Sequence, residues 1–170
     1  LIYTWFLIAI FLVIAFIDLK HLIILDSLVL AGFIVSLSYF ILSTFYPEAD
    51  PSARYGAGFL SALYGLLFFA GIFFSIFLMS KGKWIGFGDV KLAALFGFVF
   101  GLKNSISIFY LTFFIGFIIA IILLVLKRAD LRTQIPLGSL MSAAGIFFLL
   151  TGFSLLELIN TELILRLWSR

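Results

Sequence analysis

Residues 86–92 read Gly-Phe-Gly-Asp-Val-Lys-Leu and open an apolar segment that continues to residue 102. Asp89 places an acidic side chain at the edge of this segment, and Asp18 does the same at the end of the first apolar segment. A carboxylate is costly to hold ionised next to lipid, so acids in such positions usually have a function. If folding brings two of them together, they can share one proton and activate water, as in an aspartic protease.

The composition is that of a membrane protein. Of the 170 residues, 65% are hydrophobic and 11% are charged, whereas globular proteins are roughly 45–50% apolar and about 25% charged. In lipid each backbone polar group must bond within its own segment, so the apolar segments are predicted to be helices. We therefore predict an all-α polytopic membrane protein, a bundle of about six transmembrane helices, forming a single domain over residues 1–170. The six segments are residues 1–17, 22–45, 55–79, 90–102, 106–126 and 135–159.

Basic residues are distributed unevenly between the two ends of this predicted bundle. With six alternating spans, one end receives seven basic residues and the other receives four. The end with more lysine and arginine is predicted to face the cytoplasm. Asp18, Asp26 and Asp89 would then all lie at cytoplasmic ends of helices. The seven are Lys20, Lys81, Lys83, Lys91, Lys127, Arg128 and Arg132, and the four are Arg54, Lys103, Arg166 and Arg170.

Small residues predict where helices pack closely. Asp89, Ala93, Gly97 and Gly101 follow one another at intervals of four residues, so they share one stripe of the fourth helix. Small side chains mark close helix contacts in membranes. The stripe therefore predicts that Asp89 faces the protein interior, and Gly65 with other small residues predicts a similar close contact on the third helix.

Two glycines precede Asp89. Gly86 and Gly88 allow a positive φ or a close approach of another chain, and an extended peptide could lie against such a loop. The alternative is a glycine-rich turn in which Asp89 is the N-cap of the following helix, a favoured use of Asp. The two interpretations are compatible.

The other polar residues near these segments also have structural interpretations. Asp18 could be an interfacial carboxylate paired with Lys20 or His21, and Asp26 could be the N-cap of the second helix. Lys91 could pair with a carboxylate or anchor its helix at the cytoplasmic surface.

Several classes of function are disfavoured. His21 is the only histidine, the chain has no cysteine, and no ligand pair has metal-binding spacing, so we predict no metal and no cofactor. The basic residues are scattered among apolar runs, which is not typical of nucleic-acid binding. No nucleophile elbow for a serine hydrolase is present.

Three blocks together resemble the type IV prepilin peptidase family, membrane aspartic proteases of the GxGD class. The first is Ile-Asp-Leu-Lys at 17–20 with Ile-Leu-Asp at 24–26, the second is Gly-Phe-Gly-Asp-Val-Lys-Leu at 86–92, and the third is Ile-Pro-Leu-Gly-Ser at 135–139. The second block nearly matches the family's GxGDVKL. The chain departs from the family pattern at Leu25 and Ser139, where the family usually has Pro.

The resemblance implies the following function. Asp18 and Asp89 would be the catalytic pair of a peptidase that removes the short basic leader of prepilin or pseudopilin precursors, cutting after a Gly at the cytoplasmic face of the cell membrane. The partners would be these precursors and the lipid bilayer. Residues expected to bind substrate or support the site are Gly86, Gly88, Lys91 and Asp26.

The resemblance has a limit, and other functions stay open. Many family members carry an N-terminal cysteine-containing segment linked to N-methylation; this chain has no cysteine, so methyltransferase activity is not expected. The alternatives are a presenilin-like intramembrane GxGD protease, a proton- or cation-coupled membrane transporter, and a catalytically inactive subunit of a secretion or pilus machine. No inverted repeat with matched broken helices supports the transporter.

Overall fold

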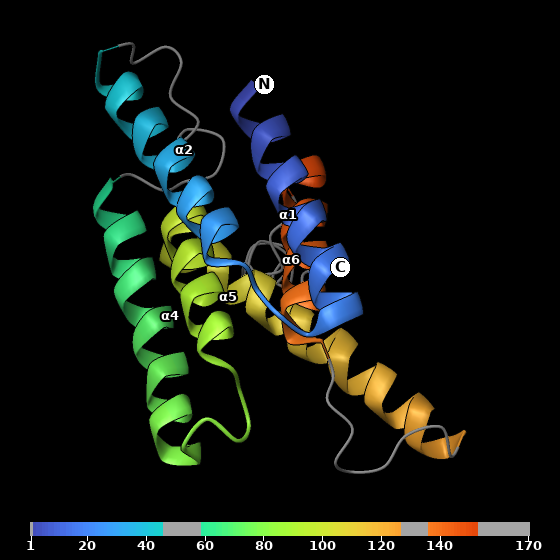
Figure 1. The fold of residues 1–170 in the computed structure, drawn as a ribbon. Helices are drawn as coiled ribbons and strands as arrows, with labels where there is room; N and C mark the ends of the chain where they lie inside the picture. Colours follow the sequence, from blue (N-terminus) through green and yellow to red (C-terminus); the bar gives the residue numbers. More distant parts are fainter. Residues whose placement is uncertain (1, 46–58, 127–135, 153–170) are drawn as a thin grey trace, which may run out of the picture.

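The computed structural model describes residues 2–45, 59–126 and 136–152 (Figure 1). They form the helices α1 (Ile2–His21), α2 (Asp26–Phe45), α4 (Phe59–Ser80), α5 (Phe87–Val125) and α6 (Leu137–Thr151). No strand occurs in these three ranges, and the prediction of an all-α protein is confirmed. Among the described helices α1, α4 and α5 are long and apolar enough to cross a membrane, and α2 and α6 are shorter apolar helices.

Helix α5 occupies the centre of the bundle. It packs against α4 and also contacts α2 and α6, while α1 packs against α6 and α2. Figure 1 shows α1 beside α6 on one side and α4 on the other, with the second part of α5 extending beyond the other helices. The segments that begin at residues 87 and 137 are thereby brought to the region where α1 ends.

The closest helix contact joins α4 and α5 at two glycines. A Cβ atom added to Gly97 would overlap the carbonyl oxygen of Gly65, and one added to Gly65 would overlap that of Gly97. Because neither residue has a side chain, the two backbones touch directly. The close contacts predicted from Gly97 and from Gly65 are confirmed, and each is the partner of the other.

The boundary predicted between the fourth and fifth apolar segments is found as a kink at one residue rather than as a loop. Both segments belong to α5, which has one non-helical residue, Gly101, with φ 69° and ψ 175°. Glycine adopts this positive φ without the steric cost that a Cβ would impose, so the chain changes direction at a single residue. The Ser105 hydroxyl then donates to the Phe96 carbonyl, 3.0 Å away, across the kink. The number of spans predicted, six, stays a prediction.

The ends of the helices also differ from the prediction. Helix α1 continues one turn past residue 17 to His21, and α5 begins at Phe87 rather than Val90. Helix α6 ends at Thr151, where Gly152 is the C-cap with a φ of 66°. The rest of the predicted sixth segment lies outside the described residues, as do Lys127, Arg128 and Arg132 of the charge argument.

Aromatic side chains fill the interior of the bundle. Phe11 of α1 stacks on Phe96 and Phe100 of α5, with ring centroids 4.7 and 6.1 Å apart, and Phe148 of α6 meets Phe100 edge-on at 5.4 Å. Phe11, Phe96 and Phe100 are almost fully buried. In a bilayer this packing supplies dispersion contacts rather than a hydrophobic driving force.

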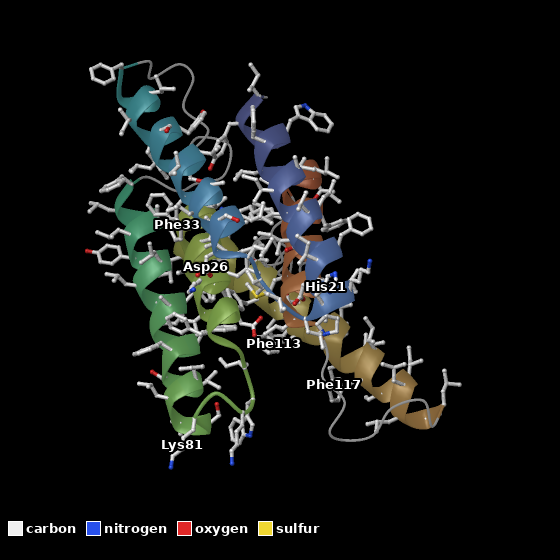
Figure 2. The ribbon with its side chains drawn as sticks, viewed as in Figure 1. His21, Asp26, Phe33, Lys81, Phe113 and Phe117 are labelled. Carbon is white, nitrogen blue, oxygen red and sulfur yellow. The ribbon has the colours of Figure 1, made fainter. Side chains whose placement is uncertain are left out.

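The outer surface of the bundle is apolar. Phe113 and Phe117, on the second part of α5, are 53% and 65% exposed, and Figure 2 shows Phe117 nearer than Phe113 to the end of α5 that extends beyond the other helices. Exposed large apolar side chains are also present on α1, α2, α4 and α6. Surface of this kind is suited to lipid, and the protein is a helical, multi-pass membrane protein.

Candidate active site

Asp18 lies in the last turn of α1 and is 4% exposed. Its Oδ2 atom accepts a hydrogen bond from the backbone N–H of Ser139, 2.6 Å away in the first turn of α6. Gly138 leaves the space that the carboxylate fills, because a Cβ atom there would lie 3.0 Å from Asp18 Oδ2. The partner of Asp18 is therefore on α6, whereas Lys20 and His21, which follow it in sequence, are exposed.

Asp89 is the third residue of α5, and its side chain is partly exposed. Its Oδ2 atom accepts a hydrogen bond from the backbone N–H of Gly86 at 3.0 Å. Gly86 is the N-cap of α5, so Asp89 bonds back to the cap from the N3 position, as the acid of a capping box does. The interpretation of Asp89 as the N-cap itself is wrong, because the helix begins earlier than the sequence predicted.

Ile24 packs against residues that neighbour each of the two acids. It belongs to the connection between α1 and α2, which in Figure 2 runs between the labelled residues His21 and Asp26. Its Cβ would lie 3.0 Å from a Cβ added to Gly88, and its Cδ1 would lie 2.9 Å from one added to Gly138. Gly88 adjoins Asp89, and Gly138 touches Asp18.

The two carboxyl groups also share an electrostatic environment. The charge of Asp18 acts on Asp89 even though the residues come from different helices. Like charges in a partly desolvated site repel each other more strongly than in water. In general, two carboxyl groups that repel each other can hold one proton between them, as those of aspartic proteases do.

The two glycines of residues 86–89 have different roles. Gly86 has φ −77° and ψ 156°, a conformation open to any residue, and a Cβ there would make only ordinary contacts. The residues with positive φ do not include Gly86 or Gly88, so of the two expected uses of these glycines a positive φ is found at neither. The close approach also expected for these glycines is found at Gly88, where Ile24 packs against the backbone.

This difference predicts unequal effects of alanine. Gly88→Ala is expected to destabilise the protein by about 1–3 kcal/mol, because the new methyl group meets Ile24 in a packed region. Gly86→Ala, the matched control, is expected to be neutral or stabilising by up to about 1 kcal/mol, since its backbone conformation suits alanine. Thermal unfolding of the purified protein in detergent measures both. Equal destabilisation by the two variants would contradict the assigned contacts.

Asp26 and Lys91 pair with each other. The Lys91 ammonium group donates to both carboxylate oxygens of Asp26, at 2.6 and 2.7 Å, and lies 4.9 Å from the centroid of the Phe87 ring. Of the two interpretations of Lys91, pairing with a carboxylate is the one found. Asp26 is the first residue of α2 rather than its N-cap, so the pair joins the start of α2 to the start of α5. A role in substrate binding stays a prediction.

The ion pair is expected to add little stability. The side chains of Lys91 and Asp26 are 33% and 72% exposed, and exposed pairs contribute about 0–1 kcal/mol. A double-mutant cycle with Lys91→Met and Asp26→Asn, followed by thermal unfolding, is expected to give a coupling energy below about 1 kcal/mol that decreases as salt is raised. A larger coupling, insensitive to salt, would show that the pair is shielded from solvent.

Three contributors to the site are not predicted from the sequence. Ser139 stands out there only as a departure from a family motif, and Gly138 and Ile24 only as parts of sequence blocks. Their contacts join residues from opposite ends of the chain, and no local pattern signals such contacts. For metal binding, a search limited to the described ranges finds no cluster of three or more acidic, His or Cys side chains.

The fold and the site together define a class: a helical membrane protein with two acids at the helix ends, each bonded to a backbone N–H. The chain also matches the type IV leader peptidase family over residues 5–125. It therefore belongs to the type IV leader peptidase family.

Curated relatives of this chain carry names that agree with this family. A prepilin leader peptidase/N-methyltransferase of Aeromonas salmonicida is 28% identical over 155 residues, which cover 91% of this chain and 50% of the relative. One of Pseudomonas aeruginosa is 32% identical over 91 residues, covering 54% of this chain and 31% of the relative. The chain thus spans about half the length, or less, of these relatives. No solved structure matches it.

Proposed function

We propose that this protein is a membrane aspartic endopeptidase that removes the leader of type IV prepilin-like precursors. The observation that carries the proposal is that Asp18 and Asp89 both lie at helix ends, and that Gly138, which contacts Asp18, and Gly88, which adjoins Asp89, both lie against Ile24. Membership of the type IV leader peptidase family supports the same activity, and so do the names of the relatives.

The reaction proposed is hydrolysis without a covalent enzyme intermediate. One of the two carboxylates is ionised and takes a proton from water, whose oxygen attacks the carbonyl carbon of the scissile peptide bond. The other is protonated and donates its proton toward the carbonyl oxygen. The carboxyl that took the proton from water then gives it to the leaving nitrogen as the C–N bond breaks. The other carboxylate takes a proton back from a hydroxyl of the intermediate, which restores the pair and releases the leader with a new C-terminal carboxyl group.

The substrate proposed is a precursor with a short basic leader, a Gly before the cut and an apolar helix after it. The helix would lie in the bilayer beside the bundle, so that the bond after Gly reaches the ends of α1 and α5. The site would face the cytoplasm, as the distribution of lysine and arginine predicts, in the cell membrane. The single-domain organisation over residues 1–170 stays a prediction.

The test is a cleavage assay in lipid vesicles. Purified protein is incubated with a precursor carrying such a leader, and the products are analysed by mass spectrometry. One cut directly after the Gly is expected, with a second precursor carrying Gly→Val at that position left intact. Proton uptake into the same vesicles, without cleavage, would contradict the proposal and favour the transporter.

A further inference from the structure

The first turn of α6 surrounds the carboxylate of Asp18. Ser139 is 5% exposed and donates its backbone N–H to Asp18 Oδ2 at 2.6 Å, although the two residues are 121 positions apart in sequence. Gly138 lies against the same group, since a Cβ atom there would approach Asp18 Cγ to 3.1 Å. Asp18 is thus held from a second helix by backbone atoms.

The donor is the backbone of Ser139 and not its side chain. The hydroxyl of Ser139 donates to the Pro136 carbonyl at 2.7 Å, within the first turn of α6 itself. The first four N–H groups of a helix have no partner inside that helix, so the Ser139 N–H is available for Asp18. A backbone donor in a helix cannot rotate, whereas a carboxyl group otherwise turns freely about its terminal bond.

We propose that Ser139 and Gly138 are positioning residues, which fix the orientation of the Asp18 carboxylate toward the reacting water. Ser139 does so through its N–H, and Gly138 does so by having no side chain. This inference rests on the proposed function, because it takes Asp18 to be one of the two reacting acids. Each residue acts through Asp18.

Ser139→Pro tests the role of the N–H group. Proline removes this one donor, and its effect on the helix is limited because the N–H had no partner within α6. Losing a hydrogen bond to the charged carboxylate raises the activation free energy, so kcat is expected to fall by about 10- to 100-fold. KM for the precursor is expected to stay within about twofold, since positioning of the acid acts on the transition state rather than on binding.

Two comparisons separate the backbone role from a structural one. Ser139→Ala keeps the N–H and removes the hydroxyl, and it is expected to recover kcat to within about threefold of the wild type, as the bond through the N–H is retained. Ser61→Pro makes the same Ser-to-Pro change at the third residue of α4, the helix position that Ser139 has in α6. It measures the effect of a proline in a helix start away from Asp18, and it is expected to leave kcat unchanged.

Gly138→Ala provides a second variant if Ser139→Pro does not fold. Its methyl group would crowd Asp18 Oδ2 and Ile24 Cδ1, so the same fall in kcat at nearly constant KM is expected. The proposal is overturned if Ser139→Pro and Gly138→Ala, or whichever of them folds, keep the wild-type kcat. It is also overturned if Ser139→Ala lowers kcat as much as Ser139→Pro does.

The experiment also separates this inference from the proposed function. Asp18→Asn is assayed in parallel, with the same precursor. If Asp18→Asn is inactive while Ser139→Pro and Gly138→Ala keep full kcat, positioning by α6 is wrong and the peptidase proposal stands. If Asp18→Asn cleaves normally, the catalytic role of Asp18 fails, whatever the α6 variants do.

Discussion

Asp18→Asn and Asp89→Asn are each expected to lower the rate of leader cleavage by about 10²–10⁴-fold. Asn keeps the size of the side chain and can still accept a hydrogen bond from Ser139 or Gly86, so the fold is expected to persist. The amide cannot take up or give a proton at working pH, and general acid–base catalysis is lost. The measurement is the initial rate of cleavage by purified variants in lipid vesicles.

The matched control is Asp26→Asn, the same exchange at an acid that is 72% exposed and paired with Lys91. It is expected to lower the cleavage rate by less than about tenfold, because an exposed pair of this kind contributes at most about 1 kcal/mol. Comparable losses in all three variants would indicate a general effect of removing negative charge. Normal cleavage by Asp18→Asn or Asp89→Asn would remove that residue from the catalytic pair.

Gly97→Ala is expected to have the largest effect on stability. Its methyl group would overlap the carbonyl oxygen of Gly65, which belongs to a helix backbone and cannot move aside as a side chain can. Separating α4 from α5 would disturb the stacking of Phe69 on Phe109, whose ring centroids are 4.1 Å apart. The cost is expected to reach or exceed about 3 kcal/mol, the upper part of the range for overpacked cores.

Gly71→Ala is the control for this prediction. Gly71 is also in α4, but a Cβ atom there meets nothing within 4 Å. Alanine favours the helix over glycine by about 1 kcal/mol, so this variant is expected to unfold at the same temperature as the wild type or above it. If Gly97→Ala unfolds as the wild type does, the two helices do not touch at Gly65 and Gly97.

The sequence predicted those features that depend on local composition and spacing. Apolar length indicated the helices, and the spacing of Gly97 from Ala93 and Gly101 indicated a face that packs closely. The positions of Asp18 and Asp89 beside apolar segments indicate a function, because a charge beside lipid is costly. Each of these inferences uses only neighbouring residues and the nature of the solvent.

Features that depend on contacts between distant segments were not predictable. The change of direction at Gly101 could not be distinguished from a loop at the polar residues that follow, because both interrupt an apolar run. Local spacing does not identify the partner of Lys91, since pairing with Asp26 requires the starts of α2 and α5 to meet. The bond from Ser139 to Asp18 links the first helix to the last described one.

The central claim is that Asp18 and Asp89 act as one catalytic unit, and the double variant tests it most directly. Single-turnover cleavage is measured for the wild type, Asp18→Asn, Asp89→Asn and the variant with both changes. Residues that act as a unit are strongly non-additive, so the double variant is expected to cleave about as slowly as either single variant. Losses that multiply in the double variant, or single variants that cleave at the wild-type rate, would contradict the account.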